Sequence, residues 1–207
     1  MEWLARLFAW FFPSVSDPEI QYIPLNTMEE MDTILNIPEP TTSRLALCYE
    51  AQPWVVTQKW GVKDRAYERF GFTHHNGTDI KHGYNSRLRA PFSYAVVGTM
   101  YQAEGGGNVL SIVSEGQFEA PDGQPAHVRI DYLHLSRYLK VQGSGGTGDL
   151  LCLAGNTGYS TGPHTHIQHR WVRRIKGRWV DVEKNDANNS FDPTPFYTGE
   201  FAVDFAK

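Results

Sequence analysis

The chain has 207 residues, of which 41% are hydrophobic, so it can build a folded core and is excluded from the disordered class. Its formal net charge of −4 speaks against nucleic-acid binding, which needs a basic excess. Nineteen glycines and twelve prolines favour β structure over a helical bundle, and two cysteines are too few for a disulfide-dense scaffold or a four-cysteine zinc site.

The first twelve residues are apolar and aromatic, and Pro13 ends the run. Apolar residues recur there at i, i+3, i+4 and i+7, namely Leu4, Leu7, Phe8 and Phe11. This spacing predicts a short amphipathic helix. The segment is too short for a transmembrane span, and Glu2 and Arg6 do not fit a cleavable signal peptide. Three roles stay open: packing on its own domain, docking to a partner protein, or anchoring at a membrane surface, which the lack of flanking lysines disfavours.

Two regions are predicted, an irregular proline-punctuated extension over residues 1–50 and a β domain over residues 51–207. In the β domain, short apolar runs alternate with glycine-rich turns, which predicts an antiparallel sheet. The expected strands cover residues 54–57, 94–101, 108–114, 127–133, 150–154 and 164–171. One helical turn is expected over residues 135–141.

A glycine-rich stretch, residues 155–162, precedes Pro163 and the pair His164 and His166. Proline cannot donate to a sheet ladder, so a strand is expected to begin there. Alternation along a strand would then place both imidazoles on one face. Such a pair suits zinc ligation, or one ligand and one acid–base group. By itself the pattern is a weak signal and more often reflects two polar residues on an exposed strand face.

His75 and Asp79 can converge around a tight bend at Gly77. Imidazole nitrogen and carboxylate oxygen are both zinc ligands. These two groups and one histidine of the pair would give three protein ligands and leave the fourth tetrahedral position open, as in catalytic zinc sites. His134, between two leucines, would remain a histidine that is not a ligand.

These stretches together resemble the lysostaphin/LytM-type zinc metallopeptidases, which cut the peptide part of bacterial peptidoglycan. Three motifs occur in the family's order: H-x-G-x-D over residues 75–79, H-L at residues 134–135, and G-x-T-G-x-S-T-G-P-H-x-H over residues 155–166. The resemblance covers roughly residues 51–200 and implies a folded antiparallel β-sheet with an open groove.

The resemblance also implies site roles, residue by residue. His75, Asp79 and His166 carry over as ligands of Zn²⁺, and His134 and His164 carry over as catalytic histidines. The division of labour between these two histidines stays open.

Two further residues are expected as substrate contacts. Tyr132 lies two residues before His134 and is expected to share its face, and His82 is expected at the groove rim. The stretches 62–74 and 104–127 are longer than usual for the family and are candidate groove walls.

The resulting hypothesis is a zinc endopeptidase that acts on peptidoglycan at the cell wall, in the periplasm or outside the cell. A phage virion or lysis role is expected, with a protein partner docked through the N-terminal helix. The alternative is a family member without catalytic activity that binds wall or activates other enzymes. The presence of all five motif residues, four histidines and one aspartate, favours activity.

Overall fold

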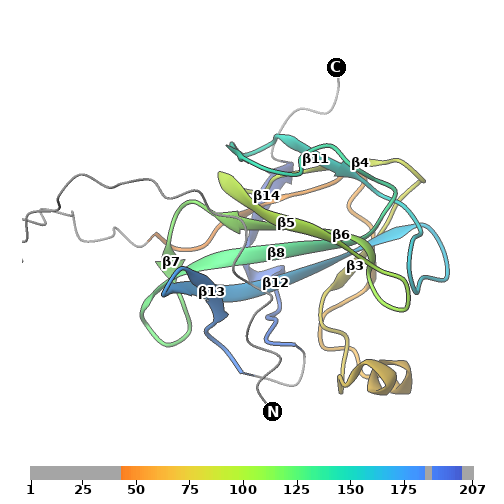
Figure 1. The fold of residues 1–207 in the computed structure, drawn as a ribbon, viewed down its shortest axis with the longest axis horizontal. Coiled ribbons are helices and arrows are strands. Elements are labelled where there is room, and N and C mark those ends of the chain that lie inside the picture. The colour runs from red at the N-terminus through yellow and green to blue at the C-terminus, as the bar shows by residue number, and fades with distance from the viewer. Residues whose placement is uncertain (1–42, 185–187, 202–207) are drawn as a thin grey trace, which may run out of the picture. The chain divides into compact units, whose positions relative to one another are not determined.

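The structure is a computed structural model that describes residues 43–184 and 188–201. The helix predicted within residues 1–12 lies outside these residues. The largest sheet has nine strands in the described part, with the order β10-β5-β6-β8-β12-β3-β2, while β13 pairs with β12 and β7 with β8 (Figure 1). The strands are β10 (Ser144–Gly145), β5 (Tyr94–Gln102), β6 (Gly107–Ser114), β8 (Pro125–Leu135), β12 (His164–Ile175), β3 (Thr78–Lys81), β2 (Val56–Gln58), β13 (Arg178–Asp181) and β7 (Phe118–Glu119).

Two smaller sheets complete the described fold. One has the order β4-β11-β9, formed by β4 (Arg87–Arg89), β11 (Leu150–Leu153) and β9 (Arg137–Tyr138). The other pairs β1 (Leu47–Tyr49) in parallel with β14 (Tyr197–Phe201). Short 3₁₀ helices occur at η1 (Arg65–Phe70) and η2 (Thr194–Phe196). None of the helices in the described part is long and apolar enough to cross a membrane.

The mainly antiparallel β fold is confirmed, and each of the six expected runs contains a strand. The helical turn expected over residues 135–141 is wrong. Arg137 and Tyr138 instead form β9, which pairs with β11. These two residues form hydrogen bonds with the backbone of a neighbouring strand. Sequence periodicity cannot reveal such a long-range pairing.

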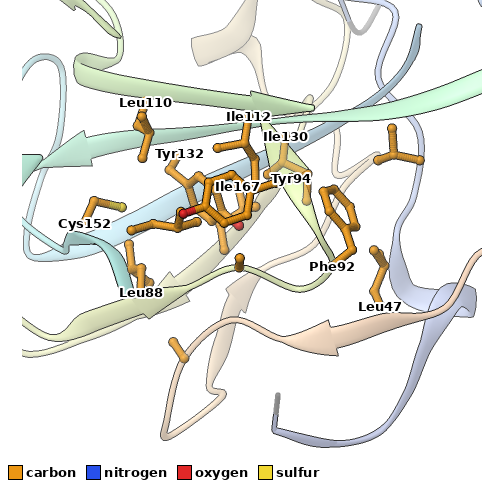
Figure 2. Packing of buried hydrophobic residues seen from close by; sticks show 14 of the residues in the cluster. Leu47, Leu88, Phe92, Tyr94, Leu110, Ile112, Ile130, Tyr132, Cys152 and Ile167 are labelled. Carbon is orange, nitrogen blue, oxygen red and sulfur yellow. The ribbon is translucent and has the colours of Figure 1, made fainter. Parts of the chain in front are cut away.

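The core lies between one face of the large sheet and the β4-β11-β9 sheet. Figure 2 draws Ile130 and Ile167 from the large sheet in the same packed cluster as Leu88 of β4 and Cys152 of β11. Alternate residues of β12 from Thr165 to Trp171 are buried, and Ile167 and Trp171 among them belong to this core. The residues between them, His164, His166, Gln168 and Arg170, therefore lie on the opposite face of the sheet.

Residues 43–50, which the sequence places in the extension, pack with the β domain. Leu45 and Leu47 are buried in its core, and β1 pairs with β14 near the other end of the chain. Glu50 is fully buried, and the Tyr197 hydroxyl donates to both of its carboxylate oxygens at 3.0 and 3.1 Å. A three-residue strand leaves almost no periodic signal, which is why the sequence places the boundary later.

Candidate metal centre

Three side chains from two neighbouring strands converge on the face of the large sheet opposite the core. Asp79 on β3 is the register partner of His166 on β12, and His75 lies in the turn before β3. Asp79 Oδ1 lies 2.9 Å from His166 Nδ1 and 3.2 Å from His75 Nε2. The two histidine nitrogens are 2.9 Å apart. One oxygen and two nitrogens thus form a small triangle.

The donor set fits a zinc ion. With bonds of about 2.0–2.1 Å, tetrahedral geometry places neighbouring ligand atoms about 3.3 Å apart, close to the edges of this triangle. His75 Nδ1 donates to the carbonyl oxygen of Lys59 at 3.0 Å, which leaves the Nε2 lone pair directed at the triangle. His75 and His166 are nearly completely buried, so their nitrogens are positioned away from bulk solvent.

The electrostatics favour an ionised carboxylate at this point. Burial by itself would raise the pKa of Asp79, but the adjacent His166 and His75 rings hold that pKa well below its usual value. Burial lowers the pKa of His166, which keeps this imidazole neutral. A neutral imidazole beside a carboxylate is the protonation state in which both groups can bind a metal.

Gly77 is the residue that permits this close approach. A Cβ atom at this position would overlap the imidazole of His166 and would lie 2.7 Å from the carbonyl oxygen of Ile167. The glycine in the H-x-G-x-D motif is therefore required by the space that the His166 ring occupies.

A β-bulge places His134 on the same face. In the pairing of β6 with β8, Asn108 is opposite Leu135 and Leu110 is opposite Tyr132, so two residues of β8 stand against one of β6. His134 has φ +64°, in the left-handed region. The bulge therefore turns two consecutive side chains, Leu133 and His134, toward the metal centre.

Backbone carbonyl groups fix both catalytic candidates. His134 Nδ1 donates to the carbonyl oxygen of Thr157 at 2.8 Å, and His164 Nδ1 donates to that of Gly162 at 2.8 Å. Both rings keep an Nε2 lone pair, and their centroids are 4.7 Å apart. His164 Nε2 lies 3.9 Å from Asp79 Oδ1. Burial is the main cause that lowers the pKa of His134 to about 4, so its ring is neutral near pH 7.

The metal centre opens into a cavity of about 560 Å³. Tyr67, Phe70 and Phe72 from the long stretch before β3 line one wall. Tyr67 stacks on His75 with ring centroids 5.2 Å apart. Gly105 and Gly106, from the turn between β5 and β6, also line the cavity. Both stretches that are expected as groove walls thus contribute to it.

The structure does not place Tyr132 or His82 in this cavity. Tyr132 is fully buried in the core, because the bulge after it reverses the alternation that the expectation assumed. His82 is 6% exposed, and neither ring nitrogen has a hydrogen-bond partner. Burial lowers its pKa to about 4. Neither residue is proposed as a substrate contact.

Four polar groups of the cavity escape the sequence analysis: Arg129, Asp131, Gln168 and Arg170. The sequence carried a signal for two of them. Alternation from His166 along β12 places Gln168 and Arg170 on the same face as the metal centre.

Comparisons with known proteins agree with this site. No family profile matches the chain. It is 32% identical over 123 residues to lysostaphin of Staphylococcus simulans and to the glycyl-glycine endopeptidase ALE-1 of Staphylococcus capitis, covering 59% of this chain. The matched part spans 21% and 28% of those relatives.

Solved structures give the same result. The catalytic domain of the antimicrobial peptidase lysostaphin from Staphylococcus simulans superposes with a TM-score of 0.51 at 25% identity, over 69% of this chain and 91% of that domain. A zinc-containing peptidase from Vibrio cholerae superposes with a TM-score of 0.50 at 25% identity, over 69% of this chain and 41% of that one. By sequence and by fold, the β domain of this chain is therefore similar to the peptidase lysostaphin and to a zinc-containing peptidase.

Proposed function

We propose that this chain is a zinc-dependent endopeptidase that hydrolyses peptide bonds in bacterial peptidoglycan. The observation that carries the proposal is the triangle of His75, Asp79 and His166 beside two histidines with free Nε2 atoms, all within one cavity. The relatives support the reaction class, since their names describe an antimicrobial peptidase and a glycyl-glycine endopeptidase.

In this proposal His75 Nε2, Asp79 Oδ1 and His166 Nδ1 hold the zinc ion. A zinc ion supplies Lewis acidity, which makes water a stronger nucleophile near neutral pH and polarises a carbonyl oxygen. The three protein ligands leave room for substrate, as in catalytic rather than structural sites.

His134 and His164 move protons in this proposal. Each ring donates through Nδ1 to a backbone carbonyl group, so Nε2 can accept a proton from the attacking water. The protonated ring can then give that proton to the amine that leaves the cleaved bond. The 3.9 Å between His164 Nε2 and Asp79 Oδ1 places this ring directly beside the ligand set.

The cavity suits a peptide in extended form. It runs along the exposed face of β12 from His164 to Arg170, and the stretch containing Tyr67 and Phe70 lines one wall. This stretch is long for the family, so we infer that it sets which cross-link or stem peptide enters.

The test is digestion of purified sacculi of Gram-negative and Gram-positive types by the zinc-loaded protein, with and without a chelator, and with the products resolved by mass. Chelator-sensitive loss of cross-linked fragments is expected, and the fragment masses identify the bond. Intact cross-links with zinc-loaded protein would contradict the proposal and favour the alternative of a wall-binding or activating relative without activity.

Two more specific proposals rest on the sequence alone. The protein acts at the cell wall as part of a phage virion or lysis system, and it docks to a protein partner through residues 1–12. Copurification of the full chain with virion particles, compared with a chain that lacks residues 1–12, would test both.

A further inference from the structure

The cavity extends beyond the metal centre along β12. After His166, the residues Gln168 and Arg170 face the same side and line the same cavity. Four residues of a strand span about 13 Å, so Arg170 lies roughly this far from the metal ligands. An extended substrate peptide has the same rise per residue. A group bound at Arg170 would therefore lie within about four residues of the scissile bond.

Two arginines stand directly opposite each other at this end. Arg129 on β8 is the register partner of Arg170 on β12, and both line the cavity. Like charges in this position are destabilising unless a counter-ion separates them. Asp131 serves this purpose, since it accepts from Arg129 Nε at 2.9 Å and from Arg170 Nη2 at 2.5 Å.

The carboxylate of Asp131 accepts hydrogen bonds on both of its oxygens. Its Oδ1 atom also accepts a hydrogen bond from the Ser111 hydroxyl group, so three donors share its two oxygens. Burial by itself would raise the pKa of Asp131, but the two guanidinium groups hold it below its usual value. Asp131 therefore stays ionised and neutralises only one of the two positive charges.

One hydrogen-bond donor of Arg170 is unused at this end of the cavity. Arg170 Nε is buried and has no hydrogen-bond partner. Asp181 Oδ1 forms an ion pair with Arg170 Nη1 at 3.6 Å and does not line the cavity. At this end, the cavity lining therefore holds two guanidinium groups and the carboxylate of Asp131, while the second counter-charge lies outside the lining. Planar guanidinium groups preferentially bind carboxylates, often through two hydrogen bonds.

We propose that Arg129 and Arg170, held in place by Asp131, form a subsite for a free carboxylate of the substrate peptide, within about four residues of the scissile bond. This inference rests on the proposed peptidase function and specifies its substrate class. A peptide that carries an ionised carboxylate at this point would be preferred over the same peptide with a carboxamide there.

The experiment uses the zinc-loaded full chain and cross-linked muropeptides from the sacculus type that it cleaves, before and after carbodiimide-coupled amidation of their carboxylates. The expected result is a kcat/KM value about 10- to 100-fold lower for the amidated substrate, from loss of a charge-assisted hydrogen bond and mostly through KM. Equal KM values for the two substrates would overturn the subsite. Failure to cleave either one would instead overturn the proposed function.

A pair of variants separates recognition from structural support. Arg129→Gln should bring the acid-to-amide ratio of kcat/KM toward one. The matched control is Arg173→Gln, an arginine whose partner Asp122 is exposed and which does not line the cavity; this variant should keep the wild-type ratio. An Arg129→Gln protein that retains the wild-type ratio would contradict the proposal. The wild-type comparison decides the question even if Arg129→Gln does not fold.

Discussion

The carbonyl oxygen of Thr157 lies 2.8 Å from Nδ1 of His134 and fixes that ring with its Nε2 lone pair free. The same threonine contacts the bulge in β8 through its hydroxyl group. Thr157 Oγ1 accepts from the backbone N–H of Asn108 at 2.9 Å and donates to the carbonyl oxygen of Leu135 at 2.8 Å. The loop that carries the third motif therefore holds the histidine of the second motif, although 23 residues separate them in sequence.

Thr157→Val tests this relationship. Valine keeps the shape of threonine but leaves the backbone N–H of Asn108 without its acceptor, so unfolding free energy should fall by about 1–3 kcal/mol. We also expect lower turnover, because the loop would hold His134 less firmly. Thr157→Ser, which keeps the hydroxyl group, is the control. Denaturant unfolding and sacculus digestion are the measurements; a Val variant that matches the Ser variant in both would refute the role.

The zinc content of single variants distinguishes the metal ligands from the catalytic histidines. Asp79→Ala should abolish stoichiometric zinc binding, because it removes one corner of the ligand triangle. His134→Ala should keep zinc and lower turnover by about 10²- to 10⁴-fold, as for loss of a general acid–base group. Elemental analysis of the dialysed proteins, paired with digestion rates, provides the comparison. If His134→Ala lost zinc as readily as Asp79→Ala, the ligand assignment would be wrong.

Gly77→Ala should damage the metal centre although it replaces none of the ligand residues. Its new methyl group would overlap the His166 ring and approach the carbonyl oxygen of Ile167. Overpacking of this kind costs about 1–3 kcal/mol, and we expect weaker zinc binding in addition. Gly98→Ala is the matched control, since a Cβ atom there meets no neighbour within 4 Å. Zinc affinity and unfolding free energy that are equal in both variants would contradict the steric explanation.

The domain boundary predicts a difference between two truncations. Removal of residues 1–42 should leave the β domain folded, because all described core residues remain. Removal of residues 1–50 deletes Leu45 and Leu47 and the Glu50 partner of Tyr197. Each lost leucine side chain costs about 2–5 kcal/mol. Thermal unfolding of the two proteins would reveal the difference, and equal stability would move the boundary back to residue 50.

The Asp131 carboxyl group predicts a pH dependence of stability. Its pKa is lower in the folded protein than the unfolded value of about 3.9. A lowered pKa contributes stability that is complete above the unfolded value and is lost as pH falls through the folded value. Asp131→Asn should therefore lower stability at neutral pH and weaken the fall below about pH 4. Denaturant titrations across this range would show it; a variant with the wild-type acid slope would argue against the ion pair.

The sequence by itself determined the antiparallel β class and the residues that are able to bind a metal or transfer protons. Alternation along a strand predicts that His164 and His166 share a face, and their separation from the core residues follows from the same period. The motifs also singled out His75, Asp79 and His134, although their roles come from the resemblance to a known family and not from local geometry. The shared face of His164 and His166 depends only on neighbours along the chain.

Tertiary structure decided which segments that are distant in sequence pair with one another. The bulge that turns His134 toward the metal centre and Tyr132 into the core depends on pairing between β6 and β8, which no local period reveals. The parallel pair of β1 and β14 joins residues about 150 positions apart. The opposition of Arg129 and Arg170 likewise follows from strand register. Sequence patterns record which face a side chain takes, whereas only long-range backbone pairing fixes which side chains meet on that face.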